Sequence, residues 1–440
     1  MENFFEKYQK IIEEAQKNRQ EMEKKASENP EQFLQELGID PNNLDLDKLK
    51  NVASNLSDQA KPLENIFKGK NFKQLNNFHN KFKSSPEATD ADKKKLQELG
   101  IRAFYADLEQ KSQFCFIEKD CDKIIDAHSI QENGELSLIA QDGKVFHFIQ
   151  NAQNGGKEKN EIEITKASTF KGFCHNHDQI FESIDQKKCT SVEQEYFLYS
   201  TRSFAYSYHN IKSFKDYFLD IITDTTSNLN PLIDSIKGLA DSIGMKLPEE
   251  LNKSAVPEIS KEQIETLEIE RFEKHRKLLI EIINNKSYSQ LEYLVYEKDF
   301  LCPLACSSWM VLHIQFGNGF LITSDGNTPY YGFPIIISVI PCENKTKIIL
   351  ARFKADNGSE LIFNQWRNLT SDTEKFEKEL SKLIIENVEN FYLSPIFWNK
   401  LSEREKTTII NAVTFEKTKF PEKRTNFEMI NFFDQKYKVK

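Results

Sequence analysis

Long apolar runs are absent from this sequence of 440 residues. A helix that crosses a membrane needs about 20 consecutive apolar residues, and no stretch of the chain approaches that length. The first 20 residues, MENFFEKYQKIIEEAQKNRQ, carry charges throughout and contain no apolar core typical of a secretory signal. From the sequence we therefore expect no membrane association and a cytoplasmic location.

Glycine and proline are also scarce, with 15 and 13 copies in the chain. Because both residues interrupt regular structure, their scarcity favours long helices. Hydrophobic residues make up 39% of the chain and charged residues 29%, which is enough apolar material for globular folding with a well-solvated surface. The length exceeds one ordinary hydrophobic core, so we expect two or three compact domains.

An excess of basic residues is missing as well, because the net charge is −9. This argues against a uniformly basic nucleic-acid-binding surface and leaves a local basic face open. The seven cysteines are odd in number and have no regular spacing. In a large chain without an export signal, such cysteines favour reduced thiols or metal ligands over disulfides.

Several common catalytic motifs do not occur in the sequence. It has no phosphate-binding loop of the Walker A type, no dinucleotide-binding glycine pattern, no Gly-x-Ser-x-Gly turn and no His-Glu-x-x-His helix. The usual sequence signals of nucleotide hydrolysis, dinucleotide binding, serine hydrolysis and zinc proteolysis are therefore lacking.

Changes in sequence pattern along the chain predict a multidomain α+β protein with four parts. Residues 1–100 predict a polar helical region, 101–190 a unit of short strands, 191–287 a helical connector and 288–440 an α+β domain. In the second part, strands are predicted at 114–117, 123–130, 136–140 and 144–149. Asp142-Gly143 between the last two is typical of a hairpin turn. The polar stretch 150–161 is predicted to be a flexible loop.

The last part combines predicted strands with two predicted helices. Apolar runs predict strands at 309–316, 320–323, 334–340 and 346–353, with a turn at 343–345. A helix is predicted from the apolar face between Phe376 and Phe391. Another is predicted to begin near Ser402, because Ser402 and Glu405 have the spacing of a capping box.

The stretch from Lys61 to Lys83 contains six lysines against one glutamate, with four phenylalanines interleaved. One interpretation is a nucleic-acid-binding surface, with lysines on phosphates and aromatic rings under bases. The other is an ordinary amphipathic helix, with phenylalanines in the core and lysines in water.

Two segments of the second part contain residues that can bind a metal. The first, CFIEKDCDKIIDAHSI, includes Cys115, Cys121 and His128, and the second, FCHNHDQIF, includes Cys174 and His177. Zinc prefers four tetrahedral sulfur and nitrogen ligands, usually as two close pairs. A cysteine pair around a turn and a Cys-x2-His pair opening a helix satisfy this preference. We therefore predict a structural zinc site.

The predicted zinc ligands are Cys115, Cys121, Cys174 and His177. The five residues between Cys115 and Cys121 exceed the usual two to four, which leaves His128 as an alternative to Cys115. We prefer Cys115, because it and Cys121 flank turn-forming residues, whereas His128 is expected at the far end of the following strand.

This arrangement resembles the treble-clef zinc finger of HNH (His-Me finger) endonucleases over about 75 residues. In that family, the histidine closing the first strand is the general base that activates water. The resemblance implies His128 as the catalytic base, with His175, Asn176 and Asp178 as candidates for the helix residue that binds a divalent ion. It also implies a requirement for Mg²⁺ or Mn²⁺, which stabilises charge on the phosphate.

The sequence thus supports two functions. The first is a zinc-stabilised module with a structural or interaction role and an unknown protein partner. The second is an HNH-like nuclease that acts on DNA or RNA, as in bacterial defence. Residues 101–190 carry 15 acidic and 11 basic side chains, so this part alone is poorly suited to binding a phosphate backbone. For a nuclease we expect the nucleic-acid contact from Lys61–Lys83.

Overall fold

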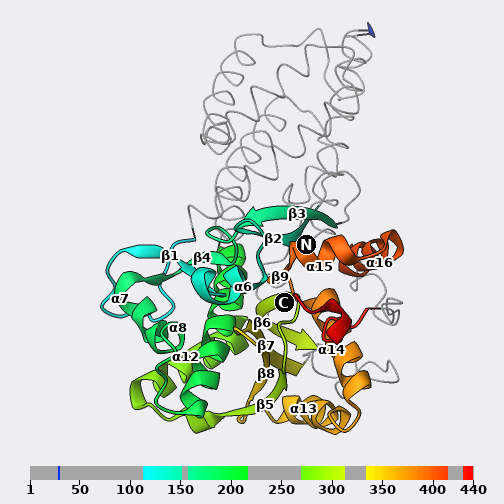
Figure 1. The fold of residues 1–440 in the computed structure, drawn as a ribbon. Helices are drawn as coiled ribbons and strands as arrows, with labels where there is room; N and C mark the ends of the chain where they lie inside the picture. The colour runs from blue at the N-terminus through cyan, green and yellow to red at the C-terminus, as the bar shows by residue number, and fades with distance from the viewer. Residues whose placement is uncertain are drawn as a thin grey trace. The chain divides into compact units, whose positions relative to one another are not determined.

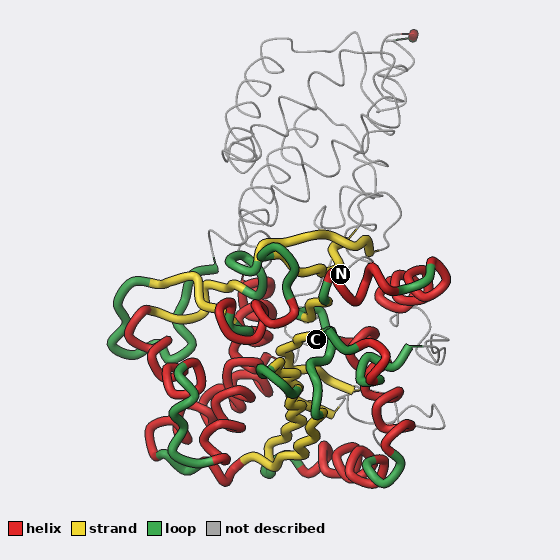
Figure 2. The backbone as a smooth tube through the Cα atoms, viewed as in Figure 1, coloured by secondary structure: helices red, strands yellow, loops and turns green. Residues whose placement is uncertain are grey.

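The computed structural model describes residues 28–29, 112–150, 157–216, 269–312, 333–414 and 430–439. The chain divides into two compact units, one of Met1–Asp107 with Lys215–Leu267 and one of Leu108–Phe214 with Glu268–Lys440. Nearly all described residues belong to the second, which we call the sheet unit (Figures 1 and 2). In the described part of the chain, no helix is both long and apolar enough to cross a membrane.

A seven-stranded sheet, in which every neighbouring pair is antiparallel, forms the centre of the sheet unit. The strand order is β3-β2-β9-β6-β7-β8-β5. The strands are β2 (Lys144–Gln150), β3 (Lys157–Glu163), β5 (Leu291–Lys298), β6 (Leu304–Leu312), β7 (Phe333–Pro341), β8 (Thr346–Phe353) and β9 (Phe391–Leu393).

Both faces of the sheet are covered, which explains why its central strands are continuous apolar runs. All eight residues of β8 are buried. Successive side chains of a strand point to opposite faces. In β7, accordingly, Ile335 and Ile337 join one hydrophobic cluster and Ile336 joins another.

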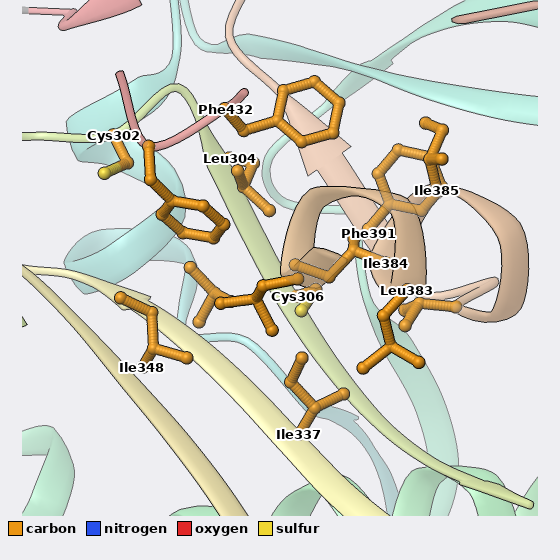
Figure 3. Close-up of a cluster of buried hydrophobic side chains, with 14 of the residues drawn as sticks. Cys302, Leu304, Cys306, Ile337, Ile348, Leu383, Ile384, Ile385, Phe391 and Phe432 are labelled. Atoms are coloured by element: carbon orange, nitrogen blue, oxygen red, sulfur yellow. The ribbon is translucent and has the colours of Figure 1, made fainter. Parts of the chain in front are cut away.

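Helices cover the two faces (Figure 1). One face packs against α13 (Asn357–Leu369), α14 (Thr373–Asn387), α15 (Pro395–Lys400) and α16 (Glu403–Thr414). Figure 3 shows part of this cluster, including Cys306 of β6 and Leu383 of α14. The other face packs against the helix at residues 192–216 and α12 (Ile269–Asn285), through side chains such as Phe204 and Phe272.

A smaller two-stranded sheet lies beside the large one and carries the residues of chemical interest. It pairs β1 (Ile124–His128) with β4 (Thr169–Cys174) in antiparallel register. Helical segments follow β4: α7 (His175–Asp178), the 3-10 turn η3 (Gln179–Phe181) and α8 (Glu182–Asp185).

The structure is a mixture of helices and antiparallel sheets, which confirms the predicted α+β class. The predicted divisions after residues 190 and 287 fall inside the sheet unit. Strands β2 and β3, from residues 101–190, belong to the same sheet as β5 to β9, from residues 288–440. The junction is the pairing of Phe146 with Leu393, and local sequence patterns do not reveal a pairing between segments so far apart in the chain.

Several local predictions are confirmed, and three are wrong. The strand at 346–353 has the predicted bounds. Asp142 and Gly143 form a turn with φ values of 53° and 73°, closed by a bridge between Gln141 and Lys144, but this turn does not join two strands as predicted. The segment predicted as a strand at 114–117 is not a strand. The strand predicted at 136–140 is helical instead, with a π-helix at Glu132–Leu136 and α6 at Ser137–Ile139. Part of the predicted loop 150–161 is strand β3. The strand predicted at 320–323 lies outside the described residues.

The predicted capping box at the start of α16 is present. The Ser402 N–H and hydroxyl both donate to Glu405 Oε2 at 2.8 Å, and the Glu405 N–H donates back to Ser402 Oγ at 3.3 Å. These contacts satisfy backbone groups that the first helical turn leaves without partners.

We expect Ser402→Ala to lower the free energy of unfolding by about 1 kcal/mol, because it removes the acceptor for the Glu405 N–H. Urea unfolding followed by circular dichroism measures the change. Thr407→Ala is the matched control, since Thr407 is exposed within the same helix and alanine has the higher helix propensity. Equal destabilisation by both substitutions would contradict a capping role.

Candidate metal centre

Four side chains from two distant segments lie together beside the small sheet. They are Cys115, Cys121, Cys174 and His177, and their candidate ligand atoms all lie within 4.8 Å of one another. The group can bind a metal such as zinc. Among the described residues it is the single cluster of three or more His, Cys, Asp or Glu side chains with this geometry. The structure thus brings together the four residues that the sequence singles out as ligands.

The three sulfurs converge on one nitrogen atom. The Nδ1 of His177 lies 3.3 Å from Cys115 Sγ, 3.6 Å from Cys121 Sγ and 3.2 Å from Cys174 Sγ. A ring nitrogen has one lone pair or one proton, so it cannot make a good hydrogen bond to all three sulfurs at once. A shared cation satisfies all four atoms together.

The spacing of these atoms also matches a tetrahedral zinc site. Zn–S bonds of about 2.3 Å and Zn–N bonds of about 2.0–2.1 Å, at tetrahedral angles, place sulfur and nitrogen roughly 3.6 Å apart. The observed separations of 3.2–3.6 Å are close to this value. Three cysteines and one histidine form a usual donor set for structural zinc. The residues present therefore fit the ion.

The first ligand pair lies at the two ends of a short reversal of the chain, which we call the metal arm (Cys115–Cys121). Glu118 and Asp120 within it have left-handed backbone conformations, with φ values of 64° and 50°. Two such residues reverse the chain tightly, so five intervening residues still place both sulfurs on one side. Each left-handed residue other than glycine costs on the order of 1–2 kcal/mol, so other interactions must hold the arm in this shape.

The second ligand pair lies where β4 passes into α7. Cys174 is fully buried and is the N-cap residue of α7, and His177 follows in its only turn. The β1–β4 pairing aligns Ile124 with Cys174, and the His175 N–H donates to the Lys123 carbonyl at 3.1 Å. The Asp122 carboxylate accepts the Asn176 N–H at 3.2 Å. Asp122 and Lys123, which follow Cys121, therefore hold the first residues of α7 in place. The second ligand pair, Cys174 and His177, lies at this helix start.

The electrostatics of the cluster also favour a bound cation. Desolvation and the nearby sulfurs of Cys115 and Cys174 raise the pKa of Cys121 to about 12. Three thiolates without a counterion would repel one another at this distance. A divalent cation removes this obstacle, since a coordinating thiol loses its proton to the metal.

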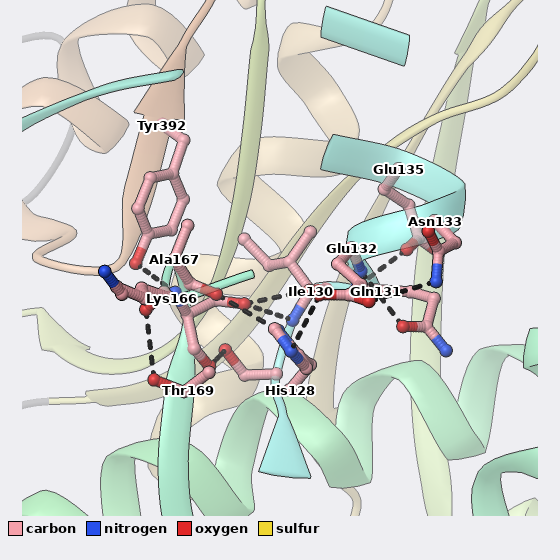
Figure 4. Close-up of polar contacts among 12 residues, drawn as sticks. His128, Ile130, Gln131, Glu132, Asn133, Glu135, Lys166, Ala167, Thr169 and Tyr392 are labelled. Atoms are coloured by element: carbon pink, nitrogen blue, oxygen red, sulfur yellow. Dashed lines mark hydrogen bonds and ion pairs between the residues drawn. The ribbon is translucent and has the colours of Figure 1, made fainter. Parts of the chain in front are cut away.

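His128 lies outside the cluster, at the end of β1 opposite Thr169 (Figure 4). Its Nδ1 lies 3.1 Å from the Ala167 carbonyl oxygen, and its Nε2 lies 3.5 Å from Glu132 Oε2. An Nδ1–H that donates to a carbonyl leaves Nε2 with a lone pair when the ring is neutral. The His128 side chain is 18% exposed. His128 is therefore not one of the four clustered ligands.

The carbonyl that orients His128 is held firmly. The next residue, Ser168, is buried with φ of 60°. Its N–H donates to the Tyr392 hydroxyl at 2.6 Å, and its hydroxyl donates to the Ile130 carbonyl at 2.8 Å. A strained residue persists where its surroundings determine it strongly. Strand β9 therefore fixes the turn that positions His128, and sequence reasoning gave no indication of this.

A buried polar network on the helix at residues 192–216 was likewise not predicted. The Arg202 guanidinium donates to both carboxylate oxygens of Asp185 at 2.8 Å. Glu135 accepts the Tyr199 hydroxyl at 3.0 Å, and burial raises its pKa. Burial also raises the pKa of Asp178, with Arg202 acting in the opposite direction. A lone buried arginine has no sequence pattern that would have identified this network.

The remaining cysteines are not part of the four-residue cluster. Cys302 and Cys306 are buried in the hydrophobic cluster of the large sheet, while Cys189 and Cys342 are half-buried. His175 and Asn176 are exposed on α7. The Lys61–Lys83 stretch lies outside the described residues.

Compared with known protein families, with curated proteins and with solved structures, the chain has no match that would assign it to a family. Its functional interpretation therefore rests on the geometry of its own residues.

Proposed function

We propose that Cys115, Cys121, Cys174 and His177 bind one zinc ion in a structural role. The observation that carries the proposal is the convergence of three sulfurs on the single Nδ1 of His177. With four protein ligands the ion has no open position for a substrate. It would join the metal arm to the β4–α7 segment and thereby stabilise a treble-clef-like module with a structural or protein-binding role.

Metal analysis of the purified full-length chain tests this function, with one zinc per chain as the expected result. Replacing zinc by Co²⁺ adds a test of the ligands, since tetrahedral thiolate-bound Co²⁺ absorbs visible light strongly. A chain that binds neither ion would overturn the proposal. A Co²⁺ spectrum of octahedral oxygen coordination would show that another site binds the metal.

A second candidate function, an HNH-like nuclease, is favoured by the position of His128. Its side chain closes β1 at the opposite end of the strand from the Ile124–Cys174 pair, and its ring is oriented by the Ala167 carbonyl. Nε2 points away from that contact and lies 3.5 Å from Glu132 Oε2. A neutral imidazole in this state can accept a proton from water. In this hypothesis Mg²⁺ or Mn²⁺ is a separate cofactor that stabilises charge on the phosphate, because the proposed zinc has no free position.

The nuclease hypothesis requires a nucleic-acid contact away from the acidic segment 101–190. We expect the triple substitution of Lys68, Lys70 and Lys73 by Gln to weaken binding of single-stranded DNA or RNA. Each lost phosphate contact should reduce the slope of log K against log salt by about 0.7. Titrations at several salt concentrations measure the slope. Replacing Lys436, Lys400 and Lys406 by Gln removes the same charge elsewhere and serves as the control; an equal loss of slope in both variants would contradict a specific contact.

A further inference from the structure

The chain passes between the two compact units three times, after Asp107, after Phe214 and after Leu267. Two of these passages involve helices of the sheet unit. The helix at 192–216 includes the second passage, and α12 begins just after the third. We call the helix at 192–216 and α12 the connecting helices. The metal arm and the residues just before it contact both connecting helices.

The segment that enters the metal arm is bound to the first connecting helix. His209 Nε2 lies 2.8 Å from the Ser112 carbonyl oxygen, and the ring of Phe114 stacks on His209 with centroids 5.0 Å apart. Within the arm, Phe116 packs edge-to-face on Tyr208 at 5.7 Å. Phe116 and Tyr208 are each 1% exposed. The arm therefore supplies part of the buried surface against which this helix packs.

The second connecting helix binds the arm through Arg276. Its Nε donates to the Phe116 carbonyl at 2.6 Å, and its Nη2 lies 3.0 Å from Glu118 Oε2. The guanidinium also donates to Glu273 at 2.7 Å, and Glu273 accepts the Tyr208 hydroxyl at 2.5 Å. One network thus joins the metal arm, α12 and the helix at 192–216.

The network depends on the shape of the arm. The Arg276 side chain is only 5% exposed, so loss of the Phe116 carbonyl would leave a buried charged donor without that partner, which is costly. The carbonyl is in place because the arm adopts its two left-handed residues and because Phe116 N–H donates to Gly172 O at 2.7 Å. A metal bound by both Cys115 and Cys121 would hold the arm closed at its two ends.

From this geometry we infer that metal binding stabilises the packing of the two connecting helices on the metal arm. The two helices lie where the chain passes to and from Lys215–Leu267. We call this metal-dependent stabilisation of the connecting helices the lock. The inference rests on the proposed metal binding. It gives the site a regulatory role beyond local stabilisation, because loss of the ion would loosen the helices that lead into and out of the other unit. Arg276 is the positioning residue that transmits the effect.

Hydrogen exchange with mass spectrometry on the full chain tests the lock, with and without a chelator and with zinc measured in the same samples. On zinc removal we expect amides near residues 205–216 and 269–276 to exchange about ten-fold faster or more, as expected when charged hydrogen bonds are lost. Strand β8 and helix α14 should change much less. A uniform increase that includes β8 and α14 would overturn the lock, since it would indicate general unfolding.

Variants separate the lock from metal binding itself. Arg276→Gln should keep its zinc, exchange rapidly at the connecting helices even when loaded, and respond little to the chelator. Arg352→Gln, another buried arginine paired with a glutamate, should keep the full response. If Arg276→Gln does not fold, Glu118→Gln removes one exposed end of the network and should give a partial effect.

The outcomes distinguish the two proposals. A chain that binds zinc but shows the same helix exchange with and without it would overturn the lock and leave the structural zinc site standing. A chain that binds no zinc would overturn both. Full zinc response in a folded Arg276→Gln or Glu118→Gln variant would show that the arm is not coupled through this network.

Discussion

Replacing Cys174 by serine is expected to remove the bound zinc and to lower the free energy of unfolding of the sheet unit by several kcal/mol. Cys174 is fully buried at the start of α7, and its sulfur lies 3.2 Å from His177 Nδ1. Serine has nearly the same volume, so the substitution leaves little cavity. Most of the loss should therefore come from the metal, whose binding free energy contributes directly to folding.

Metal analysis and urea unfolding of the same preparations measure both effects. Cys306→Ser is the matched control, because Cys306 is also buried but lies in the cluster of the large sheet. It should keep one zinc per chain and lose only the cost of burying an unpaired hydroxyl, about 1–3 kcal/mol. Cys342→Ser should also leave the zinc content unchanged.

A chelator provides a further comparison. Without metal, the stability difference between Cys174→Ser and the unsubstituted chain should shrink to the cost of burying a hydroxyl, about 1–3 kcal/mol, because the rest of the difference arises from the ion. If Cys174→Ser keeps one equivalent of zinc, or if the stability difference persists unchanged in chelator, the ligand assignment is wrong.

Replacing His128 by alanine is expected to lower nucleic-acid cleavage by about 10²–10⁴-fold, the usual contribution of a general base, if the chain is a nuclease. Folding and zinc content should change little, because His128 lies outside the four-residue cluster and is partly exposed. The activity of the unsubstituted chain should require added Mg²⁺ or Mn²⁺. Cleavage of single-stranded DNA, double-stranded DNA and RNA measures the effect.

The stability controls decide how this result is interpreted. Lost cleavage with normal zinc content and normal thermal unfolding would assign a chemical role to His128. Lost zinc in His128→Ala would instead place this residue in or against the metal site. If the unsubstituted chain cleaves none of the three substrates with either divalent ion, the nuclease hypothesis should be abandoned, and the structural zinc proposal would remain.

Local signals predicted the elements whose identity depends on nearby residues. The Ser402–Glu405 capping box, the Asp142-Gly143 turn and strand β8 were all visible in the sequence, because backbone capping, positive φ and burial on both faces leave local patterns. Strand β3 was missed because its sequence, KEKNEIE, is polar. It lies at one end of the described strand order with three of its seven residues exposed, and its pairing with β2 makes it a strand.

The sequence by itself determined the chemistry of the candidate site. Three thiols and an imidazole at these spacings, around a turn and at a helix start, defined a donor set suited to zinc. Only the tertiary structure decided that Cys115 lies with the other three residues and that His128 does not. That choice depends on the left-handed turn of the metal arm and on the pairing of β1 with β4. The contact of Arg276 with the arm was equally invisible in the sequence, because contacts between distant segments depend on packing that no local pattern encodes.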